Sequence, residues 1–188
     1  MKRVFVAIDI SDETRKKVAT YIENLRDDLK RPAARWVKPK NLHLTLHFAG
    51  DSGAHELLQL TELVAQCASN QRPFDIAIEG TGVFPNAKKP RVLWLGIRDD
   101  GKNLNMIQAD VETRSHSTEP AGKPFNPHLT IARIKDTRAC LGTVTKHLTG
   151  EFGPVEFTVS EIVIYESTLT RDGSVYSVLS QHELTGAS

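Results

Sequence analysis

The stretch Leu42-His43-Leu44-Thr45-Leu46-His47-Phe48 decides the fold. Apolar and polar residues alternate along it, so a strand would place the apolar side chains on one face and His43, Thr45 and His47 on the other. A strand that buries one face and shows polar groups on the other is typical of an antiparallel sheet. The stretch therefore predicts a half-buried strand whose polar face carries side chains capable of chemistry.

A second stretch of the same kind lies later in the chain, at Pro127-His128-Leu129-Thr130-Ile131. Both stretches read His-Leu-Thr followed by an aliphatic residue, Leu46 in the first and Ile131 in the second. On a strand this order places His and Thr side by side on one face and the aliphatic residues in the core behind them. A site held on strands is rigid, which suits transfer of a proton between placed groups.

The tripeptide His-Xaa-Thr is weak evidence by itself. Chance predicts about 0.6 matches in a chain of this composition, and this chain has four, which begin at His43, His116, His128 and His147. His116 follows a helical pattern and leads into a polar loop. His147 falls in the last turn of a helical pattern ended by Gly150, where a histidine is favourable near the terminal carbonyls. We therefore predict structural roles for His116 and His147 and a catalytic role for the other two.

Strand and helix patterns alternate along the rest of the chain. The predicted strands cover Arg3–Ile8, Leu42–Phe48, Pro73–Glu79, Arg91–Ile97 and Pro127–Ile134, and the tail from Phe157 to Leu184 is strand-rich with a hairpin turn at Arg171-Asp172-Gly173. Four helices are predicted. One follows Ser11, which offers an N-cap, and the second covers Ala54–Ala68. The third contains Leu104, Ile107 and Val111, and the fourth contains Leu141, Val144 and Leu148.

The order of these elements repeats with a matched rhythm. His43 lies 40 residues after Arg3, and His128 lies 37 residues after Arg91. We therefore predict an α+β fold of two pseudo-symmetric lobes of antiparallel sheet, with outer helices, around a central cleft. Residues 1–188 are expected to form this as a single two-lobed domain. Ordinary α+β alternation without a repeat is the alternative.

Composition and charge narrow the class of protein. The 188 residues carry 24 basic and 23 acidic side chains, a net charge of +1, which does not favour a strong non-specific grip on long nucleic acid. Cys67 and Cys140 lack metal-ligand spacing and are expected to be buried free thiols. No signal peptide or membrane span is expected, so we predict a cytoplasmic protein, and the absence of an extra apolar patch favours a monomer.

The quoted motifs resemble a known family. Asn41-Leu42-His43-Leu44-Thr45-Leu46 and Phe125-Asn126-Pro127-His128-Leu129-Thr130-Ile131-Ala132-Arg133 are similar to the two signature motifs of the RNA 2′,3′-cyclic phosphodiesterases, once called 2′-5′ RNA ligases, within the 2H phosphoesterase superfamily. Further similar stretches, in the family's order, span nearly the whole chain: Phe5-Val6-Ala7-Ile8-Asp9, Phe84-Pro85, Pro90 to Gly96, and Tyr165, Ser167, Leu169, Gly173 and Tyr176.

The resemblance implies a reaction and a role for each motif residue. In-line opening of a cyclic phosphate needs a base on one side of phosphorus and an acid on the other, and histidine serves both near neutral pH. By resemblance, His43 donates a proton to the leaving ribose oxygen and His128 accepts one from water. The hydroxyls of Thr45 and Thr130 are expected to bind the non-bridging oxygens. The implied product is a 2′-phosphomonoester, and reversal would join RNA ends by a 2′-5′ linkage.

Some residues keep open roles at this stage. Arg133 is a candidate for phosphate binding, but strict alternation puts it on the face of Leu129 and Ile131, so it reaches the cleft only if the strand ends or bulges there. His47 lines the edge of the cleft or is an exposed strand histidine. A basic rim of the cleft, which could hold further RNA phosphates, would come from Arg31, Arg35, Lys38, Lys40, Lys88, Lys89, Arg91 and Lys123.

Three other functions remain as alternatives. The same pair of histidines could act on 2′-5′ oligoadenylate, on a cyclic phosphate of an ADP-ribose derivative or on another small nucleotide. A non-catalytic RNA-binding module would keep the cleft, but the presence of both histidines and both threonines disfavours it. A metallohydrolase is disfavoured because no His-Glu-Xaa-Xaa-His motif or acidic ligand cluster accompanies the pair. We therefore expect no cofactor and no metal, and an RNA with a 2′,3′-cyclic phosphate end as the substrate.

Overall fold

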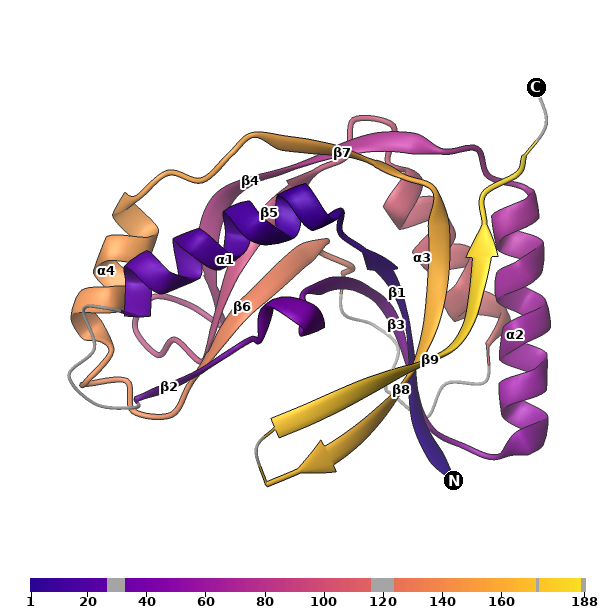
Figure 1. Cartoon of the computed structure of the whole chain (residues 1–188), viewed down its shortest axis with the longest axis horizontal. Helices are drawn as coiled ribbons and strands as arrows, with labels where there is room; N and C mark the ends of the chain where they lie inside the picture. The colour runs from indigo at the N-terminus through magenta and orange to yellow at the C-terminus, as the bar shows by residue number, and fades with distance from the viewer. Residues whose placement is uncertain (27–32, 116–123, 172, 187–188) are drawn as a thin grey trace.

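A computed structural model describes residues 1–26, 33–115, 124–171 and 173–186 (Figure 1). Within these residues the chain forms nine strands, four α-helices and one short 3-10 helix, η1. In chain order they are β1 (Lys2–Asp9), α1 (Asp12–Arg26), β2 (Ala34–Trp36), η1 (Pro39–Asn41), β3 (His43–Ser52), α2 (Ala54–Ser69), β4 (Phe74–Phe84), β5 (Val92–Arg98), α3 (Asn103–Arg114), β6 (His128–Ile134), α4 (Leu141–Thr149), β7 (Val155–Val159), β8 (Glu161–Thr170) and β9 (Gly173–Glu183).

The described strands form one continuous antiparallel sheet in the order β7-β4-β5-β6-β3-β1-β8-β9, with β2 paired to β6. Figure 1 shows this sheet curled, with α1 and α4 on the left and α2 and α3 on the right. The two strands that begin with the motif histidines, β3 and β6, lie side by side in the middle and pair through Leu44 and Leu129. The predicted α+β fold with two halves of antiparallel sheet around a centre is therefore confirmed.

The two halves exchange elements, which the sequence pattern did not indicate. After β3 and α2 the chain crosses to the far half, where β4 pairs with β5, and after β6 and α4 it crosses back, where β8 pairs with β1. The helices exchange in the same way, since α1 packs against α4 and β7, and α3 packs against α2 and β3. Each half is therefore completed by the other repeat, so one repeat does not form a half alone.

Both motif strands carry a β-bulge at the same position of the motif. Against β1, Thr45 faces Ala7 and His47 faces Val6, which leaves Leu46 as the extra residue. Against β5, Thr130 faces Trp94 and Ala132 faces Leu93, which leaves Ile131 as the extra residue. A bulge of this kind inverts the alternation of the residues that follow it. The fifth residue after each histidine, Phe48 or Arg133, therefore faces the same side as the histidine.

Several features predicted from the sequence are present among the described residues. Ser11 caps α1, since its Oγ accepts a hydrogen bond from the backbone N–H of Thr14 at 3.2 Å. Cys67 and Cys140 are buried free thiols, as predicted. None of the helices in the described ranges is long and apolar enough to span a bilayer. His116 lies outside the described residues, so the role predicted for it stays a prediction.

His147 ties the α1 and α4 helices to the sheet. It is fully buried, and its Nε2 donates to the carbonyl oxygens of Gly82 at 3.0 Å and Trp94 at 3.1 Å. Because Nε2 carries the proton, Nδ1 accepts from the hydroxyl of Tyr21 at 2.9 Å. Burial lowers the pKa of this imidazole. The structural role predicted for His147 is confirmed, with a tertiary network in place of the expected helix-end interaction.

We expect His147→Ala to lower the free energy of unfolding by about 2–4 kcal/mol, because it leaves a cavity and unpaired buried carbonyls. A histidine whose pKa is lowered by folding adds stability above the unfolded pKa of about 6.5, and this stability is lost as the pH falls below it. The variant should therefore lose less stability than the wild type between about pH 7 and pH 5. Urea unfolding at both pH values measures this, and an equal slope in both proteins would contradict it.

Candidate active site

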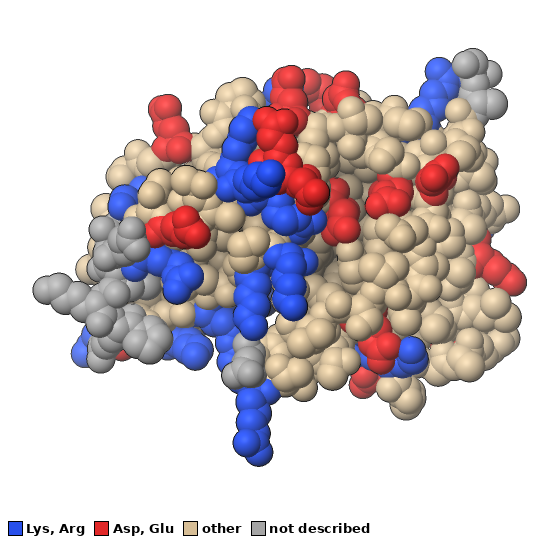
Figure 2. All heavy atoms as spheres, viewed as in Figure 1, with Lys and Arg blue, Asp and Glu red and all other residues tan. Residues whose placement is uncertain are grey.

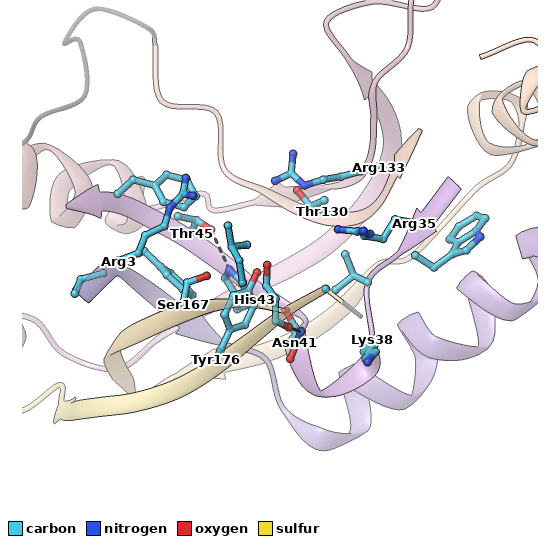
Figure 3. A pocket seen from close by; sticks show the side chains of 18 of the residues that line it. Arg3, Arg35, Lys38, Asn41, His43, Thr45, Thr130, Arg133, Ser167 and Tyr176 are labelled. Atoms are coloured by element: carbon cyan, nitrogen blue, oxygen red, sulfur yellow. Dashed lines mark hydrogen bonds between the residues drawn. The ribbon is translucent and has the colours of Figure 1, made fainter. Parts of the chain in front are cut away.

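The pairing of β3 with β6 brings the two motifs together. Leu44 faces Leu129, so continuing the antiparallel register by one residue in each direction places His43 opposite Thr130 and Thr45 opposite His128. Since these four side chains alternate with buried leucines, they share one face of the sheet. Figure 3 shows His43, Thr45 and Thr130 on this face. We call the four residues the His–Thr quartet.

Each histidine of the quartet is anchored in the same way. Nδ1 of His43 lies 2.8 Å from the carbonyl oxygen of Asn41, and Nδ1 of His128 lies 2.8 Å from the carbonyl oxygen of Asn126. A carbonyl oxygen only accepts, so Nδ1 is the protonated nitrogen in both rings. Nε2 is therefore the nitrogen left to exchange a proton in the cleft, and that of His43 lies 3.1 Å from Oγ1 of Thr45.

Aromatic side chains pack against each imidazole ring. The ring of His43 lies 4.9 Å from that of Phe5 and meets the ring of Tyr176 edge-on at 5.2 Å. The ring of His128 meets the ring of Phe84 edge-on at 4.9 Å and lies 6.2 Å from that of Trp94. These contacts restrict ring rotation, which fixes the direction of each Nε2.

The quartet opens into a cleft of about 510 Å³. Among the predicted basic rim residues, Arg35 and Lys38 line this cleft, together with Arg133 and with Arg3, which the sequence reasoning did not include. Lys40, Lys88, Lys89 and Arg91 do not line it, and Arg31 and Lys123 lie outside the described residues. The cations of the cleft are therefore carried by β1, by β6 and by the segment from β2 to η1.

The surroundings of the two histidines differ in charge. Burial lowers the pKa of His43, while the carbonyl of Asn41 and the carboxylate of Asp9 oppose the decrease and Arg15 adds to it. Burial also lowers the pKa of His128, the carbonyl of Asn126 opposes this, and Arg133 lowers it further. His43 therefore has a carboxylate and a guanidinium that act in opposite directions, whereas among the described charged groups His128 has only a guanidinium, which disfavours its protonated form.

Arg15 is a supporting residue that the sequence reasoning missed. Its guanidinium donates to the carbonyl oxygens of Ile10, Pro39 and Leu42, at 3.1, 2.8 and 3.1 Å. It thereby clamps the turn that leads into His43. Nothing in the helical pattern around Arg15 marks this role, because the partners are backbone atoms and two of them, in Pro39 and Leu42, are distant in sequence.

The two bulges determine where the side chains of His47 and Arg133 lie, which the sequence left open. His47 is buried, with 6% of its surface exposed, and its Nε2 lies 2.9 Å from Oγ of Ser115. The predictions that it lines the cleft edge or is exposed were therefore wrong, as was the buried position predicted for Phe48, which is 44% exposed and lines the cleft. Arg133 lines the cleft, because the strand bulges as that prediction required.

Among the described residues, no group of three or more His, Cys, Asp or Glu side chains is arranged to hold a metal ion. The quartet itself supplies two imidazoles and two hydroxyls, with one nitrogen of each imidazole occupied by a backbone carbonyl. This set is suited to proton transfer at both ends of a small anion.

Comparison with known proteins identifies the class. The profile of the 2′-5′ RNA ligase superfamily matches residues 14–171. A protein of Aquifex aeolicus named RNA 2′,3′-cyclic phosphodiesterase is 32% identical over 179 residues, which cover 92% of this chain and 94% of that protein. A protein of the same name from Thermotoga maritima is 31% identical over 185 residues, covering 98% and 96%. The chain therefore belongs to the 2′-5′ RNA ligase superfamily, as its motifs predicted.

Solved structures agree with this assignment. The protein TT0787 of Thermus thermophilus superimposes with a TM-score of 0.80 at 29% identity and 98% coverage of both chains. Escherichia coli LigT complexed with 3′-AMP superimposes with a TM-score of 0.75 at 26% identity and 98% coverage of both chains. The likeness thus extends over nearly the whole chain, including both motif strands.

We expect the pKa of both His43 and His128 to lie below 6.5, the ordinary value for histidine. Replacing the guanidinium by an amide in Arg133→Gln should raise the pKa of His128 and leave that of His43 nearly unchanged, because the nearby positive charge is lost. NMR titration of the imidazole resonances measures both values. A fall in the pKa of His128 in this variant, or an equal rise at both rings, would contradict the charge arrangement described above.

Proposed function

We propose that this chain is an RNA 2′,3′-cyclic phosphodiesterase that hydrolyses the cyclic phosphate to a 2′-phosphomonoester. The observation that carries the proposal is the pair of identically anchored histidines, whose Nε2 atoms are left for one cleft. The name shared by relatives at 31–32% identity over nearly the full length supports it, as does the nucleotide bound to LigT.

The proposed mechanism uses the quartet from both sides of phosphorus. Nε2 of His128 takes a proton from water as the water oxygen attacks phosphorus. The bond from phosphorus to the ribose 3′-oxygen breaks, and His43 gives its Nε2 proton to that oxygen. The hydroxyls of Thr45 and Thr130 donate to the non-bridging oxygens, where negative charge accumulates. Arg133 adds a positive charge beside His128.

Two electrostatic differences support this division of roles. Burial lowers the pKa of His43 and Arg15 adds to this, but the nearby carboxylate of Asp9 favours the protonated form that a proton donor needs. No such carboxylate of the described residues shifts the pKa of His128. Arg133 favours the neutral form of His128, which a proton acceptor needs. A 5′-hydroxyl in place of water would give up its proton to His128, attack phosphorus and displace the same 3′-oxygen, which would join two RNA ends by a 2′-5′ linkage.

We expect His43→Ala and His128→Ala each to lower kcat/KM about 10²–10⁴-fold, because each removes one proton-transfer group. Hydrolysis by the wild type should persist in a chelator such as EDTA and yield only the 2′-phosphate. The assay uses an RNA that ends in a 2′,3′-cyclic phosphate and separates 2′- from 3′-phosphate products. His55→Ala, on the exposed part of α2, is the matched control. Activity lost in chelator and restored by a metal would refute the mechanism.

The pH dependence of the rate should be bell-shaped. The active form holds one proton on the pair, and both pKa values of the free protein are lowered. The maximum of kcat/KM therefore falls below about pH 6.5. A bound phosphate anion raises both pKa values, so the maximum of kcat lies at higher pH than that of kcat/KM. Rate measurements at low and saturating substrate separate the two profiles, and a profile flat across neutral pH would count against the histidine pair.

A further inference from the structure

Two arginines face each other beside the quartet. Arg35 on β2 pairs in register with Arg133 on β6, and both side chains are exposed and line the cleft. Figure 3 shows them extending from neighbouring strands toward Thr130. Side chains directly opposite each other on antiparallel strands lie about 5 Å apart at their bases.

This arrangement opposes two like charges. Facing like charges destabilise a sheet, and no carboxylate among the described residues forms an ion pair with Arg35, Arg133 or Lys38. Lys38 lines the cleft three residues after Arg35. Three cations that gather without an anionic partner in the described structure form a site for a multiply charged anion.

The cluster extends away from the reacting centre in one direction. Arg133 lies about 7 Å beyond Thr130 along the strand, and Arg35 lies one strand further out. The charge of Arg133 acts on His128, but a single cyclic phosphate held by the quartet needs no cation as far out as Arg35. A second phosphate on the same ligand does, because successive phosphates of a nucleic acid are one nucleotide apart.

Local structure holds Arg35 in this position. In β2, Ala34 is buried and Trp36 is half-buried against the core at the edge of the cleft, whereas Arg35 is exposed. The backbone N–H of Val37 donates to the carbonyl oxygen of Ile131 at 2.9 Å, which fastens the end of β2 to the bulge of β6. The cation is therefore placed by the same strand that carries His128 and Thr130.

We propose that Arg35, with Lys38 beside it, binds the phosphate on the 5′ side of the terminal nucleoside, so that the RNA strand leaves the cleft across β2 and η1. This rests on the proposed function, since it needs the cyclic phosphate in the quartet. The site distinguishes an oligonucleotide end from a lone nucleoside cyclic phosphate. Figure 2 shows Lys and Arg side chains gathered down the middle of the face that it draws, with Asp and Glu side chains beside them at the upper end.

Arg3 marks the other direction in which the RNA strand could leave the cleft. It lines the same cleft from the start of β1, where it pairs in register with Asp51. Its position on the first half makes it a matched positional control for Arg35. Lys88, which lies in an exposed turn and does not line the cleft, controls for the loss of one positive charge.

The experiment compares kcat/KM for three substrates: a nucleoside 2′,3′-cyclic phosphate, the same nucleoside with an added 5′-phosphate, and a dinucleotide ending in the cyclic phosphate. We expect the wild type to prefer the second and third over the first by about tenfold or more. Arg35→Gln should reduce that preference about tenfold, Lys38→Gln should reduce it less, and Arg35→Lys should retain part of it. Arg3→Gln and Lys88→Gln should leave it unchanged.

Several results would overturn the inference. They are equal kcat/KM for the three substrates in the wild type, an unchanged preference in Arg35→Gln, or a loss of preference in Arg3→Gln as large as in Arg35→Gln. A preference for the dinucleotide alone would also overturn it, because the second nucleoside and not the phosphate would then be recognised.

A binding measurement distinguishes a failure of this inference from a failure of the proposed function. A chain that hydrolyses none of the three substrates contradicts the proposed function, and a dinucleotide ending in a 3′-phosphate then still tests Arg35 on the His128→Ala protein. We expect Arg35→Gln to weaken this binding about tenfold and to lower the slope of log K against log salt, because one ionic contact is lost. An unchanged affinity and slope would refute the inference by this route.

Discussion

The pairing of Leu44 with Leu129 is the constraint on which the site depends. It joins the two halves of the sheet at the first residues of β3 and β6, and it sets the register that places each histidine opposite the other motif's threonine. A slip of one residue in either strand would turn the histidine and the threonine of that strand into the core. The buried leucines that flank the quartet make such a slip costly, because the same slip would expose them to water.

The exchange of strands and helices explains why the halves stay in register. β4 and β8 each cross to the half begun by the other repeat, so sliding one half against the other would disrupt both halves of the sheet and the helices packed on them. The clamp from Arg15 to the turn before His43 crosses between elements in the same way. Precision at the quartet thus comes from interlocking of the whole chain and not from local contacts alone.

The sequence correctly predicted the fold class and the placement of His43 and His128 in one cleft. Both predictions were possible because alternation and spacing indicate the face of a strand on which a side chain lies. Sequence reasoning failed at His47 and Phe48, since alternation carries no sign of a bulge and both residue types occur on either face. It also missed Arg15, whose partners are backbone carbonyls, and the exchange of elements, which depends on strand pairings distant in sequence. The chance frequency of His-Xaa-Thr shows why the apolar context of each motif was needed.

The residues that the two matched bulges present to the cleft differ, and this difference breaks the approximate symmetry of the two repeats. A two-fold symmetric cleft would accept a cyclic phosphate in two orientations of equal free energy, and it would open either ribose–phosphate bond. The bulges present Phe48 in one half and Arg133 in the other at the same structural position. An aromatic ring in one half and a cation at the equivalent position of the other give the two orientations different free energies, so these residues contribute to the choice of the bond that breaks in the proposed reaction.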